Sequence, residues 1–191
     1  MQPGLAIVLL WCGWVLSWIA AAWWSNRTEK RPGIGGELVY RVPMLAGAVL
    51  MFVPAHGYEG PLRLWHIGWA GAWTCVALIA AGIAFAWWAR IHLGRLWSGR
   101  ITRKADHHVV DTGPYGLVRH PIYTGLLLAL LATMAAKGTV LAVAGYACLL
   151  GGIWLKARQE EQWLRQELAG GAYDDYRRRV PMLLPFGPKD G

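Results

Sequence analysis

The chain has 191 residues, of which 55% are hydrophobic and only 16% are charged. Soluble globular domains carry about 25% charged residues, so this composition argues against a soluble protein. The formal net charge of +8 at pH 7 would favour a nucleic-acid partner in a soluble protein, but here the basic residues lie between long apolar segments. We therefore predict a polytopic membrane protein of the all-α class, with membrane lipids and no nucleic acid as partners.

Five apolar segments follow one another along the chain, at residues 4–24, 42–55, 67–89, 121–136 and 139–155. Segments of about 20 apolar residues are long enough to cross a bilayer as helices, so we expect five transmembrane helices. The first segment lacks the basic start of a cleaved signal peptide, and we interpret it as a span. Only Lys137 and Gly138 separate the last two segments, which predicts a tight antiparallel helical hairpin.

The charged residues sort to one side of this arrangement. All but Arg63 and Lys137 of the 19 Lys and Arg lie in residues 25–41 and 90–120 or in the tail. The positive-inside rule then places the N-terminus outside and the C-terminus in the cytoplasm of a multi-pass protein of the cell (inner) membrane. The tail also carries three consecutive arginines that we expect to meet anionic lipid headgroups, namely Arg177, Arg178 and Arg179.

The three cysteines lie far apart, each within an apolar segment: Cys12, Cys75 and Cys148. There is no C-x-x-C pair and no histidine at ligand spacing near any of them. This pattern predicts separate apolar thiols, with no disulfide and no metal site.

Two polar stretches bracket the last two apolar segments. ADHHVVDTGPYGLVRHPIY precedes them at residues 105–123, KARQEEQWL follows at residues 156–164, and YDDYRRRVP comes next at residues 173–181. An antiparallel hairpin brings the start of its first helix beside the end of its second. We therefore expect three residues of the first stretch to face three of the second: Arg119, His120 and Tyr123 against Arg158, Glu160 and Glu161.

Two interpretations of this charged group stay open on the residues alone. Ionisable groups at a membrane boundary are costly unless paired or hydrated, and by default they indicate a functional site. The alternative is that Arg119 pairs with Glu160 or Glu161 only to clamp the hairpin. His120 is equally suited to capping the helix that begins at Pro121, because proline fits the first turn of a helix.

The same parts would suit a ligand that carries both charge signs. The first turn of a helix beginning at Pro121 presents unpaired N–H groups to an anion. Glu160 and Glu161 would accept hydrogen bonds from ribose hydroxyls or an ammonium group. The backbone around Val109 and Val110, with the ring of Tyr115, would hold an adenine.

The runs HHVVDTGPYGLVRHPIYTG, RQEEQWL and GGAYDDYRRRVPMLLPF resemble the isoprenylcysteine carboxyl methyltransferase (ICMT) family, in matching order and spacing, over about residues 93–187. The membrane phospholipid methyltransferases share part of the pattern. The resemblance implies an integral membrane enzyme that uses S-adenosyl-L-methionine to methylate a lipophilic acceptor from the bilayer, most simply the carboxylate of an isoprenylcysteine-like substrate. Residues 1–92 would be a three-helix scaffold, and residues 93–191 would be the cofactor-binding catalytic half.

The resemblance also implies roles for individual residues, with the site on the cytoplasmic side. It implies catalytic roles for Arg158, Glu161 and His120. Arg158 lies near the position of an arginine that meets the substrate's carboxylate, whereas His120 or Glu161 would serve as a base for an amine or thiol acceptor. The implied cofactor contacts are His107, His108, Val109, Val110, Tyr115, Arg119, His120, Pro121, Ile122, Tyr123, Glu160 and Glu161.

Two other functions are compatible with such a chain. Membrane sterol and steroid reductases share a similar C-terminal hairpin but bind NADPH. The pair Glu160 and Glu161 argues against them, because a dinucleotide phosphate prefers basic contacts. The second alternative is a non-catalytic membrane protein that retains the fold. The methyl acceptor is also open among a prenylcysteine, a phospholipid amine and a small thiol.

Overall fold

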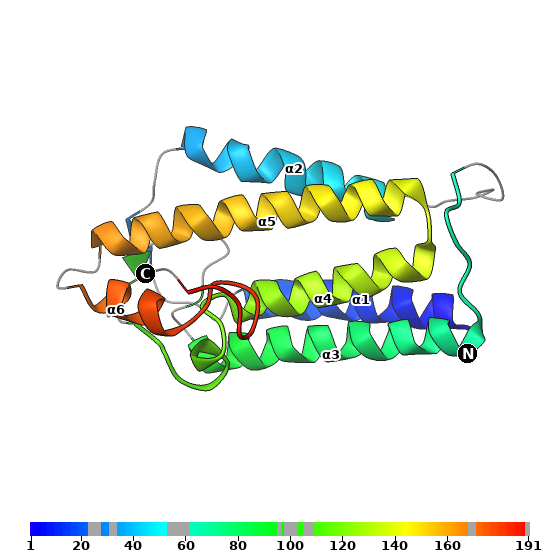
Figure 1. The fold of residues 1–191 in the computed structure, drawn as a ribbon, viewed down its shortest axis with the longest axis horizontal. Coiled ribbons are helices and arrows are strands. Elements are labelled where there is room, and N and C mark those ends of the chain that lie inside the picture. Colours follow the sequence, from blue (N-terminus) through cyan, green and yellow to red (C-terminus); the bar gives the residue numbers. More distant parts are fainter. Residues whose placement is uncertain are drawn as a thin grey trace.

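The computed structural model describes residues 1–22, 28–30, 34–52, 62–94, 97, 103–104, 109–167 and 171–189. Its helices are α1 (Pro3–Ala21), α2 (Ile34–Phe52), α3 (Trp69–Leu93), α4 (Pro121–Lys137), α5 (Val140–Glu167) and α6 (Ala172–Arg179), with a 3-10 turn η2 (Gly113–Gly116). Two short strands, β1 (Thr28–Lys30) and β2 (Arg103–Lys104), pair antiparallel. Apart from this pair, the described elements are helical, as the sequence predicts (Figure 1).

Three of the described helices are long and apolar enough to cross a membrane: α1, α3 and the part of α5 up to Gln166. The helix α4, at 17 residues, is a shorter apolar helix. These helices define a membrane protein. The number of five spans and the orientation in the membrane stay predictions.

Two helices extend beyond their apolar segments, because charged side chains continue the helix. The second apolar segment begins at residue 42, whereas α2 begins at Ile34. Within α2, Glu37 and Arg41 form an i,i+4 ion pair at 2.6 Å, which supports the helix without adding apolar character. Likewise, α5 continues well past residue 155. There the residues from Lys156 onward are largely good helix formers.

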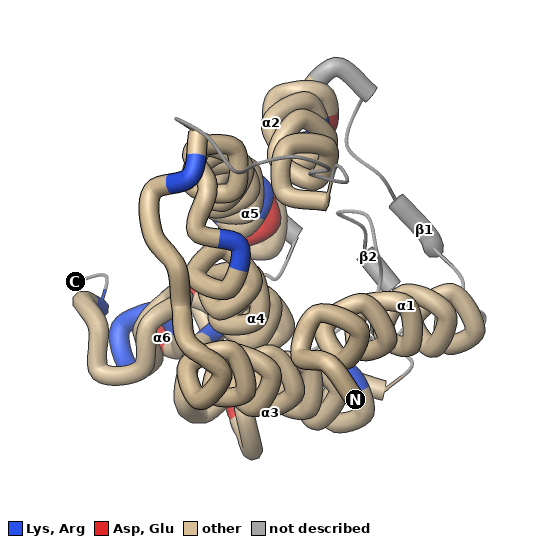
Figure 2. The backbone as a smooth tube through the Cα atoms, turned by 90° about the vertical axis from the view of Figure 1, so that its right-hand side faces the viewer, with Lys and Arg blue, Asp and Glu red and all other residues tan. Residues whose placement is uncertain are grey.

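The helices pack in two pairs that glycines hold in close contact. α5 packs on α2 and α4 packs on α3, while α1 lies beside α3 (Figures 1 and 2). A Cβ on Gly125 of α4 would collide with the backbone of Gly82 in α3, and one on Gly145 of α5 would lie 2.9 Å from the carbonyl oxygen of Gly47 in α2. Small residues of this kind let two helix backbones approach closely within a membrane.

The predicted tight hairpin of α4 and α5 is not confirmed. The two helices run antiparallel (Figure 1) and are joined at Gly138, whose φ of 59° lies in the left-handed region. However, α4 packs more extensively on α3, and α5 on α2, than the two pack on each other. The two glycine contacts explain this, because each draws one member of the hairpin toward a different partner.

The turn between α4 and α5 is covered by the segment that precedes α3. The Leu64 amide donates to the Gly138 carbonyl at 2.7 Å, and the Val140 amide donates to the Leu62 carbonyl at 2.9 Å. Arg63 pairs with Thr139 in the same bridge, so Arg63 and Lys137 lie at one end of the bundle. These are the two basic residues that the charge pattern separates from the rest.

Candidate active site

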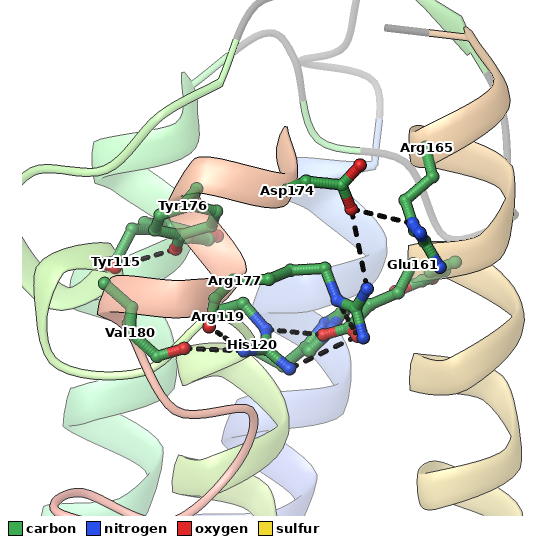
Figure 3. Close-up of polar contacts among 10 residues, drawn as sticks. Tyr115, Arg119, His120, Glu161, Arg165, Asp174, Tyr176, Arg177 and Val180 are labelled. Atoms are coloured by element: carbon green, nitrogen blue, oxygen red, sulfur yellow. Dashed lines mark hydrogen bonds and ion pairs between the residues drawn. The ribbon is translucent and has the colours of Figure 1, made fainter. Parts of the chain in front are cut away.

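A buried ion pair between Arg119 and Glu161 forms the centre of the candidate site. It lies at the N-terminal end of α4, opposite to the turn at Gly138. Glu161 of α5 is 5% exposed, and Arg119 precedes the first turn of α4. The Arg119 Nε donates to one carboxylate oxygen of Glu161 at 2.7 Å, and its terminal nitrogen donates to the other at 3.2 Å (Figure 3). This bidentate geometry is the strongest form of an arginine–carboxylate ion pair.

Two further side chains converge on Glu161. The His120 Nε2 lies 3.2 Å from one oxygen, and the Arg177 Nε of α6 lies 3.3 Å from the other (Figure 3). A buried carboxylate is strongly destabilising unless it is paired and hydrogen-bonded. Its partners here come from the segment before α4 and from α6, so Glu161 connects the polar end of α5 to both.

The C-terminal segment closes over Arg119 with backbone carbonyls. The Arg119 guanidinium donates to the Val180 carbonyl at 2.6 Å. The amides of Arg119 and His120 donate to the carbonyls of Pro181 and Met182 at 2.9 and 3.1 Å. The stretch before α4 is therefore paired with residues 180–182 and held in place by them.

The second carboxylate, Glu160, faces the other edge of His120. The Tyr123 hydroxyl donates to Glu160 Oε1 at 2.8 Å, and His120 Nδ1 lies 3.6 Å from Glu160 Oε2. The rings of His120 and Tyr123 stack, with centroids 5.5 Å apart and planes 9° from parallel. The imidazole thus has one nitrogen toward each carboxylate, an arrangement that can hold or pass a proton.

The loop before α4 is fixed by aromatic contacts. The Tyr176 hydroxyl of α6 donates to the Tyr115 carbonyl at 2.7 Å. Burial raises the pKa of the Tyr176 phenol, so it remains a neutral donor over the physiological range. His92 of α3 stacks on Tyr115 and lies against Gly113, where φ is 57° and a Cβ would come within 2.7 Å of the imidazole. Only glycine fits that position.

The structure brings together most of the residues that the sequence singles out. As predicted, Arg119, His120 and Tyr123 face Glu160 and Glu161. Among the other candidates, Val110, Tyr115 and Ile122 share one apolar cluster, Val109 packs against the buried face of α6, and Pro121 is the first residue of α4. His107 and His108 lie outside the described residues.

Arg158 does not join this group. It is exposed, and its guanidinium lies over the ring of Trp154, 4.8 Å from the centroid. Its recorded contact is with Trp154 and not with Arg119, His120 or Tyr123. The expected facing of Arg158 and these three residues is therefore wrong, and a catalytic role for Arg158 stays a prediction.

Sequence reasoning gave Lys156 no role at this end, and it assigned the three arginines of α6 to lipid headgroups. Lys156 of α5 is buried, with its Nζ 3.8 Å from Glu160. The three arginines expected at lipid headgroups each pair with an acidic side chain: Arg177 with Glu161 and Asp174, Arg178 with Asp175, and Arg179 with Asp111. The i,i+3 spacing within YDDYRRR was the available signal for the pairs inside α6.

The fold and the site together define a helical membrane protein with a buried arginine–histidine–carboxylate cluster at one end of its bundle. Residues 75–166 match the family described as Isoprenylcysteine carboxyl methyltransferase (ICMT). The resemblance to this family that the sequence predicts is confirmed.

Several curated relatives match over parts of the chain. Methanethiol S-methyltransferase 2 of Bradyrhizobium diazoefficiens is 45% identical over 153 residues, covering 74% of this chain and 57% of the relative. The cobalt-zinc-cadmium resistance protein CzcN of Cupriavidus metallidurans is 32% identical over 123 residues, covering 63% and 55%. Protein-S-isoprenylcysteine O-methyltransferase of Schizosaccharomyces pombe is 29% identical over 86 residues, covering 45% and 36%. The chain thus spans little more than half the length of the first two of these relatives.

Proposed function

We propose that this chain is a membrane methyltransferase that uses S-adenosyl-L-methionine to methylate a lipophilic acceptor. The observation that carries the proposal is the placement of His120 between the carboxylates of Glu160 and Glu161, with Arg119 in a bidentate ion pair with Glu161. Relatives named as methyltransferases support the reaction class. The charge distribution supports a site on the cytoplasmic side of the cell membrane, formed by residues 93–191.

The described residues suit this cofactor in both charge and polarity. Glu160 keeps part of its carboxylate exposed, and its negative charge suits an ammonium group or ribose hydroxyls. Val110, Tyr115 and Ile122 form an apolar cluster of the kind that packs against an adenine. When bound, the cofactor supplies a methyl group on a positively charged sulfur. Glu161 is already held by three partners, so its role is to position Arg119 and His120.

Methyl transfer from sulfur is an in-line displacement, so accurate positioning is the main requirement. A carboxylate acceptor is already ionised and needs no base. A thiol acceptor must lose its proton, and we propose His120 or Glu161 as the base that takes it. For the acceptor we propose a lipophilic carboxylate or thiol, since the relatives' names include isoprenylcysteine and methanethiol.

The test is direct ligand binding to detergent-purified protein, measured by calorimetry with S-adenosylmethionine, S-adenosylhomocysteine and NADPH. We expect the first two to bind and NADPH not to bind. Glu160→Gln should weaken binding about tenfold or more, because a hydrogen bond to a charged group contributes about 1.5–3 kcal/mol.

The matched control is Asp175→Asn, which removes an exposed carboxylate paired with Arg178 on α6 and should leave binding unchanged. Binding of NADPH alone would assign the chain to the reductases. If none of the three ligands bound, the cluster would be a structural clamp and the proposal would be refuted.

A further inference from the structure

We propose that the turn at residues 184–187, which follows α6, inserts into the lipid interface of the membrane beside the first turn of α4. The insertion anchors the neighbouring residues 180–182, whose carbonyls pair with Arg119 and His120. The partner of this exposed apolar surface is therefore the bilayer itself. This role goes beyond the proposed function and does not depend on it, because it requires only a membrane protein.

Three consecutive apolar side chains project from the protein at this turn. Leu184 is 68% exposed, Phe186 is 98% exposed, and Pro185 between them is exposed as well. By contrast, Leu183 packs against the main apolar cluster of the bundle. The Gly187 amide donates to the Leu184 carbonyl at 2.9 Å and closes the turn. The turn thus holds its apolar side chains outward, where contact with water would be costly and contact with lipid favourable.

A contact with α4 sets the depth of the turn. The Thr124 hydroxyl, in the first turn of α4, donates to the Leu183 carbonyl at 2.6 Å. Arg119 and His120 lie just before this helix, whereas residues 121–136 contain no charged side chain. Figure 1 shows the residues after α6 reaching the start of α4. The turn therefore lies where the charged cluster gives way to the apolar helix, which is the depth at which interfacial apolar side chains are buried in a membrane.

The backbone at Phe186 is strained, and the protein itself does not offset that strain. Its φ is 63°, and among the described residues no other residue except glycine has a positive φ. A turn with proline at its second position and a positive φ at its third normally has glycine or asparagine there, because a larger side chain is costly. With a side chain 98% exposed, Phe186 gains almost nothing from packing. Burial of its ring in lipid would supply the missing stabilisation.

The charges around the turn also suit a membrane surface. Residues 180–189 contain no acidic side chain, and Lys189 is exposed. A lysine near the membrane is attracted to anionic headgroups. The arginines of α6 are less available for this contact, since Arg178 pairs with Asp175 and Arg179 with Asp111. The lipid contact of the tail, which the sequence assigns to the arginines, is made by the apolar turn.

Insertion of the turn holds residues 180–182 on the candidate site. These residues directly precede the turn, and they accept hydrogen bonds from the Arg119 side chain and from the amides of Arg119 and His120. A turn that leaves the membrane would release them. Burying a phenylalanine side chain corresponds to a factor of about 10 or more in an equilibrium constant. Without the ring, the pairing should open more often by about that factor.

A spin label at residue 184 measures the depth of the turn. The 191-residue chain, with its three cysteines replaced by alanine, carries Leu184→Cys and keeps Phe186. It is placed in nanodiscs of phosphatidylcholine and phosphatidylglycerol. We expect the label to collide more often with oxygen, which concentrates in the bilayer, than with a water-soluble nickel chelate. Leu131→Cys, 42% exposed on α4, is the reference in lipid, and Arg178→Cys on α6 is the reference in water.

Phe186→Asn separates lipid contact from backbone strain, because asparagine adopts a positive φ more readily than phenylalanine. If the turn lay in water, this variant would be at least as well ordered as wild type. We expect the reverse in nanodiscs: hydrogen exchange at the amides of Arg119 and His120 should be about tenfold faster. The label at residue 184 should also become accessible to the nickel chelate. Phe186→Leu, which keeps an apolar side chain, is the matched control and should stay close to wild type.

Three results would overturn the proposal. Equal access of the nickel chelate to the labels at residues 184 and 178 would place the turn in water. Shielding of the label from both reagents would mean that protein, such as a second copy of this chain, covers the turn. Exchange in Phe186→Asn that is unchanged or slower than in wild type would show that lipid does not hold the segment. None of these measurements requires a bound cofactor, so a failure of the proposed function would be seen separately, in the ligand-binding test.

Discussion

Replacing Arg119 by methionine should destabilise the protein far more than breaking an ion pair of equal length at the surface. The change removes the donors to both oxygens of Glu161 and to the Val180 carbonyl. Removing one partner of a buried pair costs about 3–5 kcal/mol. His120 and Arg177 still face Glu161, so we expect the lower end of that range. At about 2–4 °C per kcal/mol for a chain of this size, Tm should fall by about 6–12 °C.

The control is the ion pair between Arg165 and Asp174, visible beside the buried one in Figure 3. Its length is 2.8 Å against 2.7 Å for Arg119 and Glu161, but its side chains are 50% and 39% exposed. Exposed pairs contribute about 0–1 kcal/mol, so Arg165→Met should shift Tm by no more than a few degrees. Thermal unfolding in detergent, followed by tryptophan fluorescence, measures both variants. Equal shifts would refute the reasoning that burial determines the energy of this pair.

Other predictions concern the packing and the buried phenol. Gly125→Ala should lower Tm by separating α3 and α4, at about 1–3 kcal/mol, whereas Gly13→Ala, with open space around it, should not; thermal unfolding compares them. Tyr176→Phe should cost about 1–2 kcal/mol by leaving the Tyr115 carbonyl unpaired, as denaturant titration would show. Burial raises the pKa of Tyr176 above 10.0, so the folded state keeps a proton that the unfolded state loses. Stability should therefore fall as pH rises above 10.0, and Tyr176→Phe should reduce that slope in Tm measured against pH.

The core of the candidate site could be predicted from the sequence because it follows from local order. Arg119 and His120 directly precede Pro121, which starts a helix, and Glu160 and Glu161 follow the next apolar run. Any antiparallel arrangement of the two helices brings those residues to the same end. The contacts that the structure shows depend on this end-to-end relation and not on how closely the helices pack.

Other parts of the site could not be predicted, for distinct physical reasons. The backbone carbonyls of residues 180–182 accept hydrogen bonds from Arg119 and His120. Because every residue has such a carbonyl, the sequence does not indicate which ones take part. The orientation of α5 at its charged end was also hidden. Between Lys156 and Gln162 the only apolar residue is Ala157, so the sequence shows no apolar face that would distinguish Lys156 from Arg158.

The arrangement of the helices was predicted less well than their existence. Gly47 with Gly145 and Gly82 with Gly125 select the partners of α5 and α4, yet these pairs are distant in sequence. Single glycines in apolar helices do not reveal which other glycine they will meet. The start of α2 could not be predicted either. Its first part contains the charged pair Glu37 and Arg41, and charged residues before an apolar segment look like a loop by composition.

The backbone pairing of residues 180–182 with the stretch before α4 imposes an order on biosynthesis. Arg119 leaves the ribosome well before the carbonyls of Val180 and Pro181 that it binds. During that interval its guanidinium must be hydrated or held by Glu161, because the backbone carbonyls that accept from it have not yet been made. The cluster is therefore completed only after translation has reached the last few residues of this sequence, and a ribosome that stops short of Val180 releases a bundle whose central arginine lacks those acceptors.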